Sequence, residues 1–143
     1  YYSEEGILIK AIPDDGDDYY ENYLPGINPT KQVIIEIVQK QYPNAKIIEI
    51  DMENGFIEVE IIDNGRGKEV IFDNKQIWVN THYDVRKNEV EQVVINTINK
   101  KYAGYHIDDI EKYETPTGNY YQFELELGEK ENIVKIGLDG KII

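Results

Sequence analysis

The chain contains a short pattern that recurs sixty residues later, and this repeat constrains the fold more than any other feature. The segment KQYPNAKIIEID begins at Lys40, and the related segment KKYAGYHIDDIE begins at Lys100. Both place a Tyr, two Ile three residues apart and an acid at the same spacing. The matched positions are Val33 and Val93, Tyr42 and Tyr102, Ile47 and Ile107, and Ile50 and Ile110. Self-similarity at a fixed period indicates a structural unit that is used twice.

The match continues beyond this segment at a larger offset. IEVEI at residues 57–61 matches FELEL at residues 123–127, which is an offset of 66. The same offset joins Asp73 and Lys75 to Asp139 and Lys141. The change from 60 to 66 falls within ETPTGN, residues 114–119, where a hairpin loop tolerates six extra residues. The sequence therefore predicts a tandem duplication with an insertion in one loop.

The first copy predicts one helix followed by four short antiparallel strands. Asn28 is a suitable N-cap, and Pro29 fits the first helical position. Apolar residues then recur at helical spacing until Pro43 ends the helix near Tyr42. Strict alternation of apolar residues and Glu in FIEVEI indicates a strand with one buried face. The expected strands cover residues 46–50, 56–61, 68–73 and 76–79.

The second copy predicts the same order of elements. Asn88 can cap a helix, and Glu91 three residues later completes an arrangement like a capping box. The apolar stripe of this helix contains Val90, Val93, Val94, Thr97, Ile98 and Tyr102. The expected strands cover residues 106–110, 120–127, 132–138 and 141–143.

The predicted fold class is α+β, with two tandem repeats that each have a helix and a four-stranded antiparallel sheet. Packing both helices on one sheet face buries the apolar stripe of each helix. An acidic N-terminal extension covers residues 1–28, repeat 1 covers 29–83 and repeat 2 covers 84–143. The two repeats are expected to form one domain, whose other sheet face is open or meets a partner.

The order of these motifs resembles a known family. YPNAKIIEID, NG, VEI, DNG, FDNK and a Trp follow one another as in the PepSY-like, beta-lactamase-inhibitor-like family of exported bacterial proteins. The resemblance covers residues 24–143. It implies binding or inhibition rather than catalysis, a periplasmic, cell-surface or secreted location, and no catalytic residues.

Charge limits the classes of partner. The chain carries a net charge of −13, which repels phosphate backbones and anionic lipid surfaces. We therefore expect no nucleic-acid partner, and a cation or a basic protein surface as the electrostatic complement. No apolar run approaches the roughly 18 residues of a membrane span.

The residues offer little for catalysis. Cys is absent, Ser3 is the only Ser, and His82 and His106 lack metal-ligand spacing. NGRGK at residues 64–68 lacks phosphate-loop spacing and reads as a hairpin turn. Paired carboxylates could act in hydrolysis, but alternating Glu is common on the solvent face of a strand. These pairs are Glu58 with Glu60 and Glu124 with Glu126.

A calcium site is an alternative at the acidic N-terminal segment DDGDD. Asp14, Asp15, Asp17 and Asp18 could supply the oxygens that calcium prefers, although the EF-hand pattern is not met. A solvated acidic linker explains the same residues. This alternative predicts an envelope protein that responds to calcium or a small ligand; otherwise we expect no cofactor.

The aromatic residues suggest a surface for a protein or peptide partner. Strand parity places Phe56, Ile71 and Trp78 opposite a buried set that contains Val59, Val70 and Ile77. Local packing of Trp78 is the plainer reading of that residue. The candidate partner-binding residues are Phe56, Ile71, Trp78, Tyr83, Tyr120 and Tyr121. The sequence thus predicts a non-enzymatic binding module, with a hydrolase as a third candidate.

Overall fold

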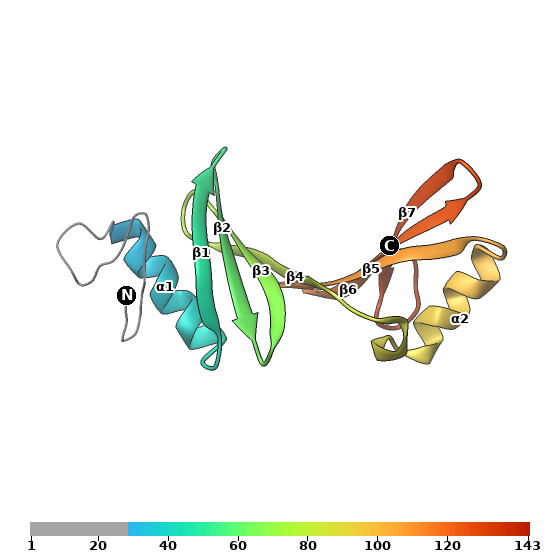
Figure 1. Ribbon diagram of the computed structural model, residues 1–143, viewed down its shortest axis with the longest axis horizontal. Coiled ribbons are helices and arrows are strands. Elements are labelled where there is room, and N and C mark those ends of the chain that lie inside the picture. The colour runs from blue at the N-terminus through green and yellow to red at the C-terminus, as the bar shows by residue number, and fades with distance from the viewer. Residues whose placement is uncertain (1–28) are drawn as a thin grey trace. The chain divides into compact units, whose positions relative to one another are not determined.

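The computed structural model describes residues 29–143, which form two helices, a short 3₁₀ helix and an antiparallel sheet of seven strands in the order β1 to β7 (Figure 1). The fold is therefore α+β, as predicted. In chain order the elements are α1 (Pro29–Gln41), β1 (Lys46–Glu53), β2 (Phe56–Asp63), β3 (Arg66–Asp73), β4 (Trp78–Asp84), η1 (Lys87–Glu89), α2 (Gln92–Lys101), β5 (His106–Thr115), β6 (Gly118–Leu127) and β7 (Lys130–Gly137). The acidic residues Asp14, Asp15, Asp17 and Asp18 lie outside the described range.

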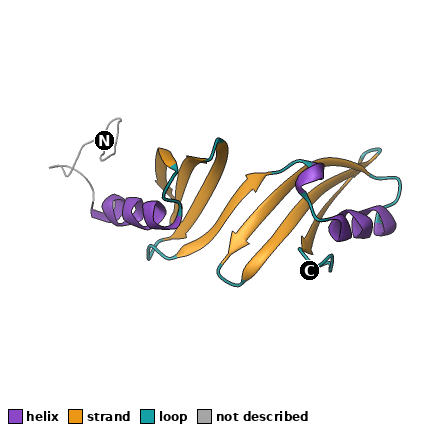
Figure 2. Cartoon of the chain, turned by 90° about the horizontal axis from the view of Figure 1, so that it is seen from below, coloured by secondary structure: helices purple, strands orange, loops and turns teal. Residues whose placement is uncertain are grey.

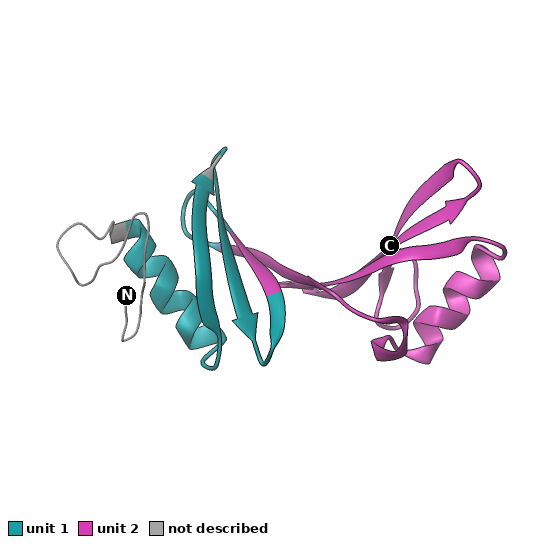
Figure 3. Cartoon of the chain, in the orientation of Figure 1, with its two compact units in different colours: residues 1–67, 72–77 teal, residues 68–71, 78–143 magenta. Residues whose placement is uncertain are grey.

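The chain divides into two compact units (Figure 3). Among the described residues, the first comprises 29–67 together with Phe72–Ile77, and the second comprises Lys68–Ile71 and Trp78–Ile143. Strand β4 belongs to the second unit because it pairs with β5, with His82 opposite Tyr113. Within each unit one helix lies against one face of the strands (Figure 2).

In the first unit α1 begins at Pro29, as predicted, and packs through one stripe of side chains. Ile34, Val38 and Tyr42 are buried, at the i, i+4 spacing that aligns residues on one helix face. On β2 the side chains alternate between buried and exposed, and the three buried ones are Ile57, Val59 and Ile61. The β1–β2 and β2–β3 turns each have an Asn–Gly pair at positive φ, as these predicted turns require.

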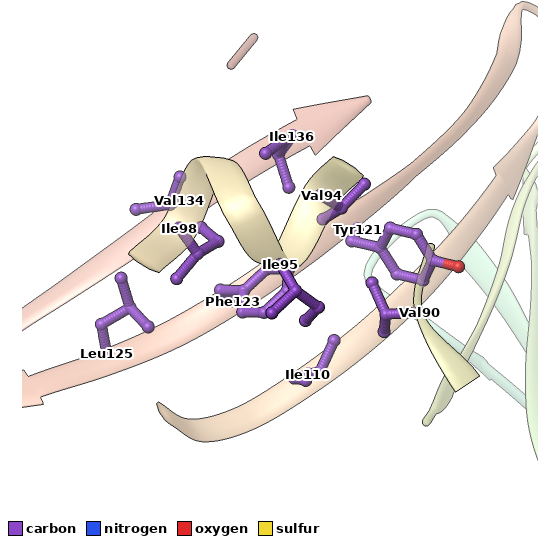
Figure 4. Packing of buried hydrophobic residues seen from close by; sticks show 10 residues of the cluster. All are labelled: Val90, Val94, Ile95, Ile98, Ile110, Tyr121, Phe123, Leu125, Val134 and Ile136. Atoms are coloured by element: carbon purple, nitrogen blue, oxygen red, sulfur yellow. The ribbon is translucent and has the colours of Figure 1, made fainter. Parts of the chain in front are cut away.

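The second unit has its own core between α2 and strands β5–β7 (Figure 4). Val94, Ile95 and Ile98 of the helix belong to one buried cluster with Phe123 and Leu125 of β6, and Phe123 and Leu125 have no exposed surface. Ile95 is buried in the core, whereas Val93, which was predicted to face it, is 46% exposed. This ten-residue helix buries only one stripe of side chains, and that stripe is rotated by part of a turn from the predicted one.

Helix α2 starts three residues later than predicted, since its N-cap is Glu91 rather than Asn88. Asn88 lies within the 3₁₀ helix η1, and Glu91 is the N-cap residue of α2. Glu89 explains the difference, because its Oε1 accepts a 2.7 Å hydrogen bond from the backbone N–H of Arg86 and caps η1 instead. The extended backbone of Val90 then separates η1 from α2 and places the Val90 side chain in the core.

The hairpins β1–β2 and β5–β6 each have a register shift at a corresponding place. Aligning these shifts gives the number of residues that separates corresponding positions of the two hairpins. The register shifts between Ile47 and Glu49 in the first hairpin, and between Ile107 and Asp109 in the second. Ile47 pairs with Ile61, whereas Ile107 pairs with Leu125, so the offset on the returning strand is 125 − 61 = 64.

The offset of 66 expected from the sequence therefore differs from the structural one by two residues. The offset of 66 matches Ile61 with Leu127, which is 42% exposed. The offset of 64 matches Ile61 with Leu125, and these two residues are both fully buried. The recurrence of Asp73 and Lys75 at Asp139 and Lys141 has a local cause. In both places the Asp Oδ1 accepts a hydrogen bond from the backbone N–H two residues later.

Two further expectations about strand ends differ from the structure. The strand expected at residues 141–143 is reduced to one bridge between Ile142 and Ile136. The strand expected from residue 76 begins at Trp78, because Asp73 closes a turn by accepting a hydrogen bond from the backbone N–H of Ile77. Ile77 lies in that turn and is 59% exposed rather than buried.

Candidate functional site

The second unit has one sheet face packed on α2 and an opposite face, here called the open face, that no described element of this unit covers. Strand β6 shows the division, since Tyr121, Phe123 and Leu125 are buried while the residues between them are half-buried. Cross-strand register determines which side chains meet on the open face. His82 lies opposite Tyr113, and Tyr113 lies opposite Tyr120.

These three residues form a stack that we call the aromatic row. The ring centroids of His82 and Tyr113 are 4.9 Å apart, and those of Tyr113 and Tyr120 are 5.0 Å apart with planes only 4° from parallel. Directly opposed side chains on neighbouring strands have Cβ atoms about 5 Å apart, so the sheet itself sets this spacing. The row therefore crosses β4, β5 and β6 as one continuous feature.

Polar groups fix both ends of the aromatic row. At one end, Nε2 of His82 lies 2.9 Å from Oε1 of Glu69, and Nδ1 lies 2.9 Å from Oδ1 of Asn80. At the other end, Nζ of Lys135 lies 5.6 Å from the ring centroid of Tyr120, a cation–π distance. These contacts hold the orientations of the rings at both ends of the row. Burial and the neighbouring carboxylate of Glu111 raise the pKa of Tyr113 to about 12, so its hydroxyl stays protonated near neutral pH.

Three carboxylates gather next to the aromatic row, and we call them the acid triad. Asp84, Asp109 and Glu111 each offer a carboxylate oxygen, and these oxygens all lie within 4.8 Å of one another. Partial burial raises the pKa of Asp109, and the charges of Asp84 and Asp108 add to the effect. Burial also raises the pKa of Glu111, with Asp84 and Asp109 adding and His82 opposing. The triad thus carries like charges that its surroundings leave partly uncompensated.

Sequence reasoning missed this grouping, although its residues carry a signal. Asp84 meets Glu111 only because β4 pairs with β5, and these strands are separated along the chain by η1 and α2. Once that pairing is known, the spacing of Asp109, Glu111 and Tyr113 at every second residue places all three side chains on one face.

The predicted partner-binding residues are spread over different environments. Phe56 is 53% exposed on β2, while Ile71, Trp78 and Tyr83 are half-buried. Trp78 packs locally, since its Nε1–H donates a 3.0 Å hydrogen bond to Oγ1 of the buried Thr81. Tyr83 donates a 3.0 Å hydrogen bond to Glu114, and Lys68 lies over its ring.

Of the two adjacent tyrosines in the candidate set, only Tyr120 is available at the surface. Tyr121 is 1% exposed and belongs to the core of the second unit, so its prediction as a surface contact is corrected. The reason is strand parity, because neighbouring residues on β6 point to opposite faces. The hydroxyl of Tyr121 reaches the edge of the core and donates a 2.7 Å hydrogen bond to Oε1 of Glu91.

No protein-family model and no curated protein sequence matches the chain. Solved structures do match it. A BLIP-like protein from Bacteroides fragilis NCTC 9343 has a TM-score of 0.73 and 24% identity, over 82% of this chain and 86% of that one. A DUF2874 family protein from Bacteroides uniformis ATCC 8492 has a TM-score of 0.69 and 20% identity, over 81% and 86%.

A third match is a Bacteroides eggerthii DSM 20697 protein whose name points to the periplasm. Its TM-score is 0.68 at 16% identity, over 81% of this chain and 85% of that one. None of the helices in residues 29–143 combines the length and apolar character that a membrane crossing requires. These likenesses confirm the predicted resemblance at the level of the backbone: the chain has the fold of the BLIP-like and DUF2874 proteins.

Proposed function

We propose that this protein is a non-enzymatic binding module that contacts a protein or peptide through the open face of its second unit. The aromatic row carries the proposal, because His82, Tyr113 and Tyr120 stack across three strands yet keep part of their surface exposed. Aromatic side chains dominate binding energy at interfaces. Fixed rings also lose little side-chain entropy when a partner binds.

The proposed architecture is a tandem duplication of one helix-and-hairpin unit. The equivalent register shifts at Ile47 and Ile107 support it, as does the matched burial of Ile61 and Leu125. In this proposal residues 29–83 and 84–143 are the two copies. The second copy gained four residues in its hairpin, since the offset rises from 60 to 64.

We also propose that the protein is exported, to the periplasm or the cell surface or as a secreted protein. The matching Bacteroides eggerthii protein supports this by its name. The exported character implied by the family resemblance points the same way.

The same proposal assigns no catalytic role to the paired glutamates. Glu58 and Glu60 are exposed, and Glu124 and Glu126 are half-buried on the open face. The pairs occur at corresponding places in both hairpins, which favours a solvent-facing strand pattern over one active site. The calcium alternative at the acidic N-terminal segment stays a prediction, because its residues lie outside the described range.

A capture experiment with paired variants tests the proposed function. The purified chain is immobilised, and proteins retained from an envelope extract are compared with those retained by Tyr113→Ala/Tyr120→Ala. Loss of one specific partner is expected, with affinity reduced about thirtyfold or more for each Tyr that is removed, because buried aromatic anchors contribute about 2 kcal/mol each.

The matched control is Ile77→Ala, which removes an apolar group that is 59% exposed and lies in a turn of the first unit. Circular dichroism verifies that every variant is folded. Retention of the same partner by the double variant would contradict a role of the open face.

A further inference from the structure

The proposed binding function can be sharpened to the chemistry of the partner. Resting on that function, we infer that the partner presents a basic segment whose Lys or Arg side chains bind the acid triad beside the aromatic row. The acid triad is Asp84, Asp109 and Glu111, and the row is His82, Tyr113 and Tyr120.

The charge of the open face is the first argument. Register places the triad in rows across the strands, where Glu111 lies opposite Gln122 and Asp109 lies opposite Glu124. Among the described strand residues of this face, Lys135 is the one Lys or Arg, and its ammonium group already lies over Tyr120. The carboxylates of this face are Glu69, Asp84, Asp109, Glu111, Glu124, Glu126 and Glu131. A basic surface is the electrostatic complement.

Apolar surface next to the carboxylates is the second argument. Ile133 is 65% exposed and lies opposite Glu124, and the half-buried rings of Tyr113 and Tyr120 flank the triad on its other side. Lys and Arg side chains have long apolar stems that lie along such surface while the charged group reaches an acid. The face therefore offers both contacts that a basic side chain needs.

The mutual repulsion of the triad is the third argument. Partial burial and neighbouring like charges raise the pKa values of both Asp109 and Glu111, which means that the charged form of each is disfavoured in the free protein. A bound cation would relieve this repulsion. Binding should therefore release protons where these carboxyl groups titrate, and it should strengthen as the pH rises through their raised pKa values.

The geometry fits an organic cation better than a metal ion. Calcium binds six to eight oxygens, and peptide carbonyls often complete its shell. Here the triad lies on the paired strands β4 and β5, whose carbonyl groups are used in sheet hydrogen bonds. A guanidinium or ammonium group needs only two or three acceptors and can approach from solvent.

Titration with model peptides tests the inference on the full chain. The probe is a peptide of alternating lysine and valine, and its counterpart alternates glutamate and valine. Heat of binding is measured at about 0.05 M salt, where screening of exposed charges is weak. The site variant is Asp84→Asn/Asp109→Asn/Glu111→Gln.

The control variant removes three exposed charges from the first unit through Glu36→Gln, Glu49→Gln and Glu60→Gln. Both variants lose the same net charge, so they separate local recognition from general attraction. We expect the basic peptide to bind the site variant about tenfold more weakly than the unchanged chain. The control variant should change affinity by less than about twofold.

Several outcomes would overturn the inference. Equal loss in both variants would mean diffuse attraction, and no binding at millimolar peptide would mean that the face does not take a basic segment. Self-association that the site variant abolishes would make a second copy of this chain the occupant. Displacement of the peptide by one equivalent of calcium would make the triad an ion site. None of these outcomes decides the proposed function. That function is tested separately, by whether the variant Tyr113→Ala/Tyr120→Ala still retains the captured partner.

Discussion

The hydroxyl of Tyr121 donates a 2.7 Å hydrogen bond to Oε1 of Glu91, which ties β6 to the N-cap residue of α2. The ring of Tyr121 is in the core, so this contact is the polar end of a buried side chain. We expect Tyr121→Phe to lower the free energy of unfolding by about 1 kcal/mol, because a hydrogen bond to a charged but exposed acceptor is lost. Urea denaturation measures it. Tyr120→Phe, on the opposite face, is the control and should change stability by less than half as much.

The same contact predicts a pH dependence. The hydrogen bond from Tyr121 lowers the pKa of Glu91 below its ordinary value of 4.5. A carboxyl group whose pKa is lower in the folded state stabilises the fold above its unfolded-state pKa, and that contribution disappears as the pH falls through the folded-state pKa. Glu91→Gln should therefore reduce stability at pH 7 and have little effect in strong acid. An equal effect at both pH values would contradict this assignment.

The acid triad predicts a pH dependence of the opposite sign. The pKa values of Asp109 and Glu111 are raised in the folded protein, so their charged forms destabilise the fold above those pKa values and cease to do so as the pH falls. Asp109→Asn and Glu111→Gln should each raise the free energy of unfolding at pH 7 by about 0.5 kcal/mol. The gain should shrink as the pH falls through the raised folded-state pKa, and it should be absent below the ordinary carboxyl pKa. Urea denaturation at several pH values measures both variants, and a loss of stability at pH 7 would show that the carboxylates are already compensated.

The hydrogen bond between Trp78 and Thr81 predicts how substitutions at Thr81 change stability. Thr81 is fully buried and its Oγ1 accepts the Nε1–H of Trp78, so Thr81→Val leaves the indole without that acceptor. We expect a loss of about 1–2 kcal/mol, whereas Thr81→Ser keeps the hydroxyl and should cost less through its missing methyl group. Because Trp78 is the only Trp, its fluorescence also reports the change, as greater access to a soluble quencher. Equal destabilisation by Val and Ser would remove the hydrogen bond as the cause.

Gly140 lies where the turn after β7 packs closely on α2, so a substitution there tests how tight this packing is. Its φ is +85°, and an added Cβ would lie 3.0 Å from Val93 Cγ2 and 3.2 Å from Thr97 Oγ1. The Thr97 hydroxyl donates a 2.8 Å hydrogen bond to the Gly140 carbonyl, which holds the two elements together. Gly140→Ala should cost about 2 kcal/mol or more, through both backbone strain and crowding.

Gly65→Ala is the matched control for this substitution. Gly65 has a similar φ of +81°, but nothing lies within 4 Å of its added Cβ. It should therefore cost only the backbone strain of about 1 kcal/mol. Thermal or chemical unfolding of the two variants gives the difference, and equal losses would show that α2 yields to the extra methyl group.

Local patterns predicted the elements of this fold well. The Pro29 start of α1, the Asn–Gly turns and the alternation of β2 are all encoded within a few residues, and the structure has each of them. The start of α2 was less accessible. Glu89 and Glu91 both lie near Asn88, and either acid is suited to the start of a helix. Glu89 caps η1 and Glu91 begins α2, because the residue between them, Val90, has its side chain in the core.

The candidate site depends on information that a single sequence does not display. Its residues meet through the register of β4 on β5, which is set by tertiary packing rather than by a hairpin turn. Tyr121 illustrates the sensitivity of such inferences. Tyr120 lies on the open face and its neighbour Tyr121 lies in the core, because side chains alternate along a strand. An error of one residue in the assignment therefore places a side chain on the wrong face.

The longer hairpin of the second unit carries the sheet beyond the aromatic row. In the first unit Glu53 pairs with Phe56 immediately before the turn, whereas the equivalent pair, Tyr113 and Tyr120, is followed by two further pairs. Those added residues extend β5, and the first of them, Glu114, is the residue opposite Thr81 on β4. The aromatic row therefore lies inside the β5–β6 ladder and not at its end. In the shorter hairpin the corresponding pair stands at the rim of the sheet, whereas Tyr113 and Tyr120 have paired strand on both sides of them.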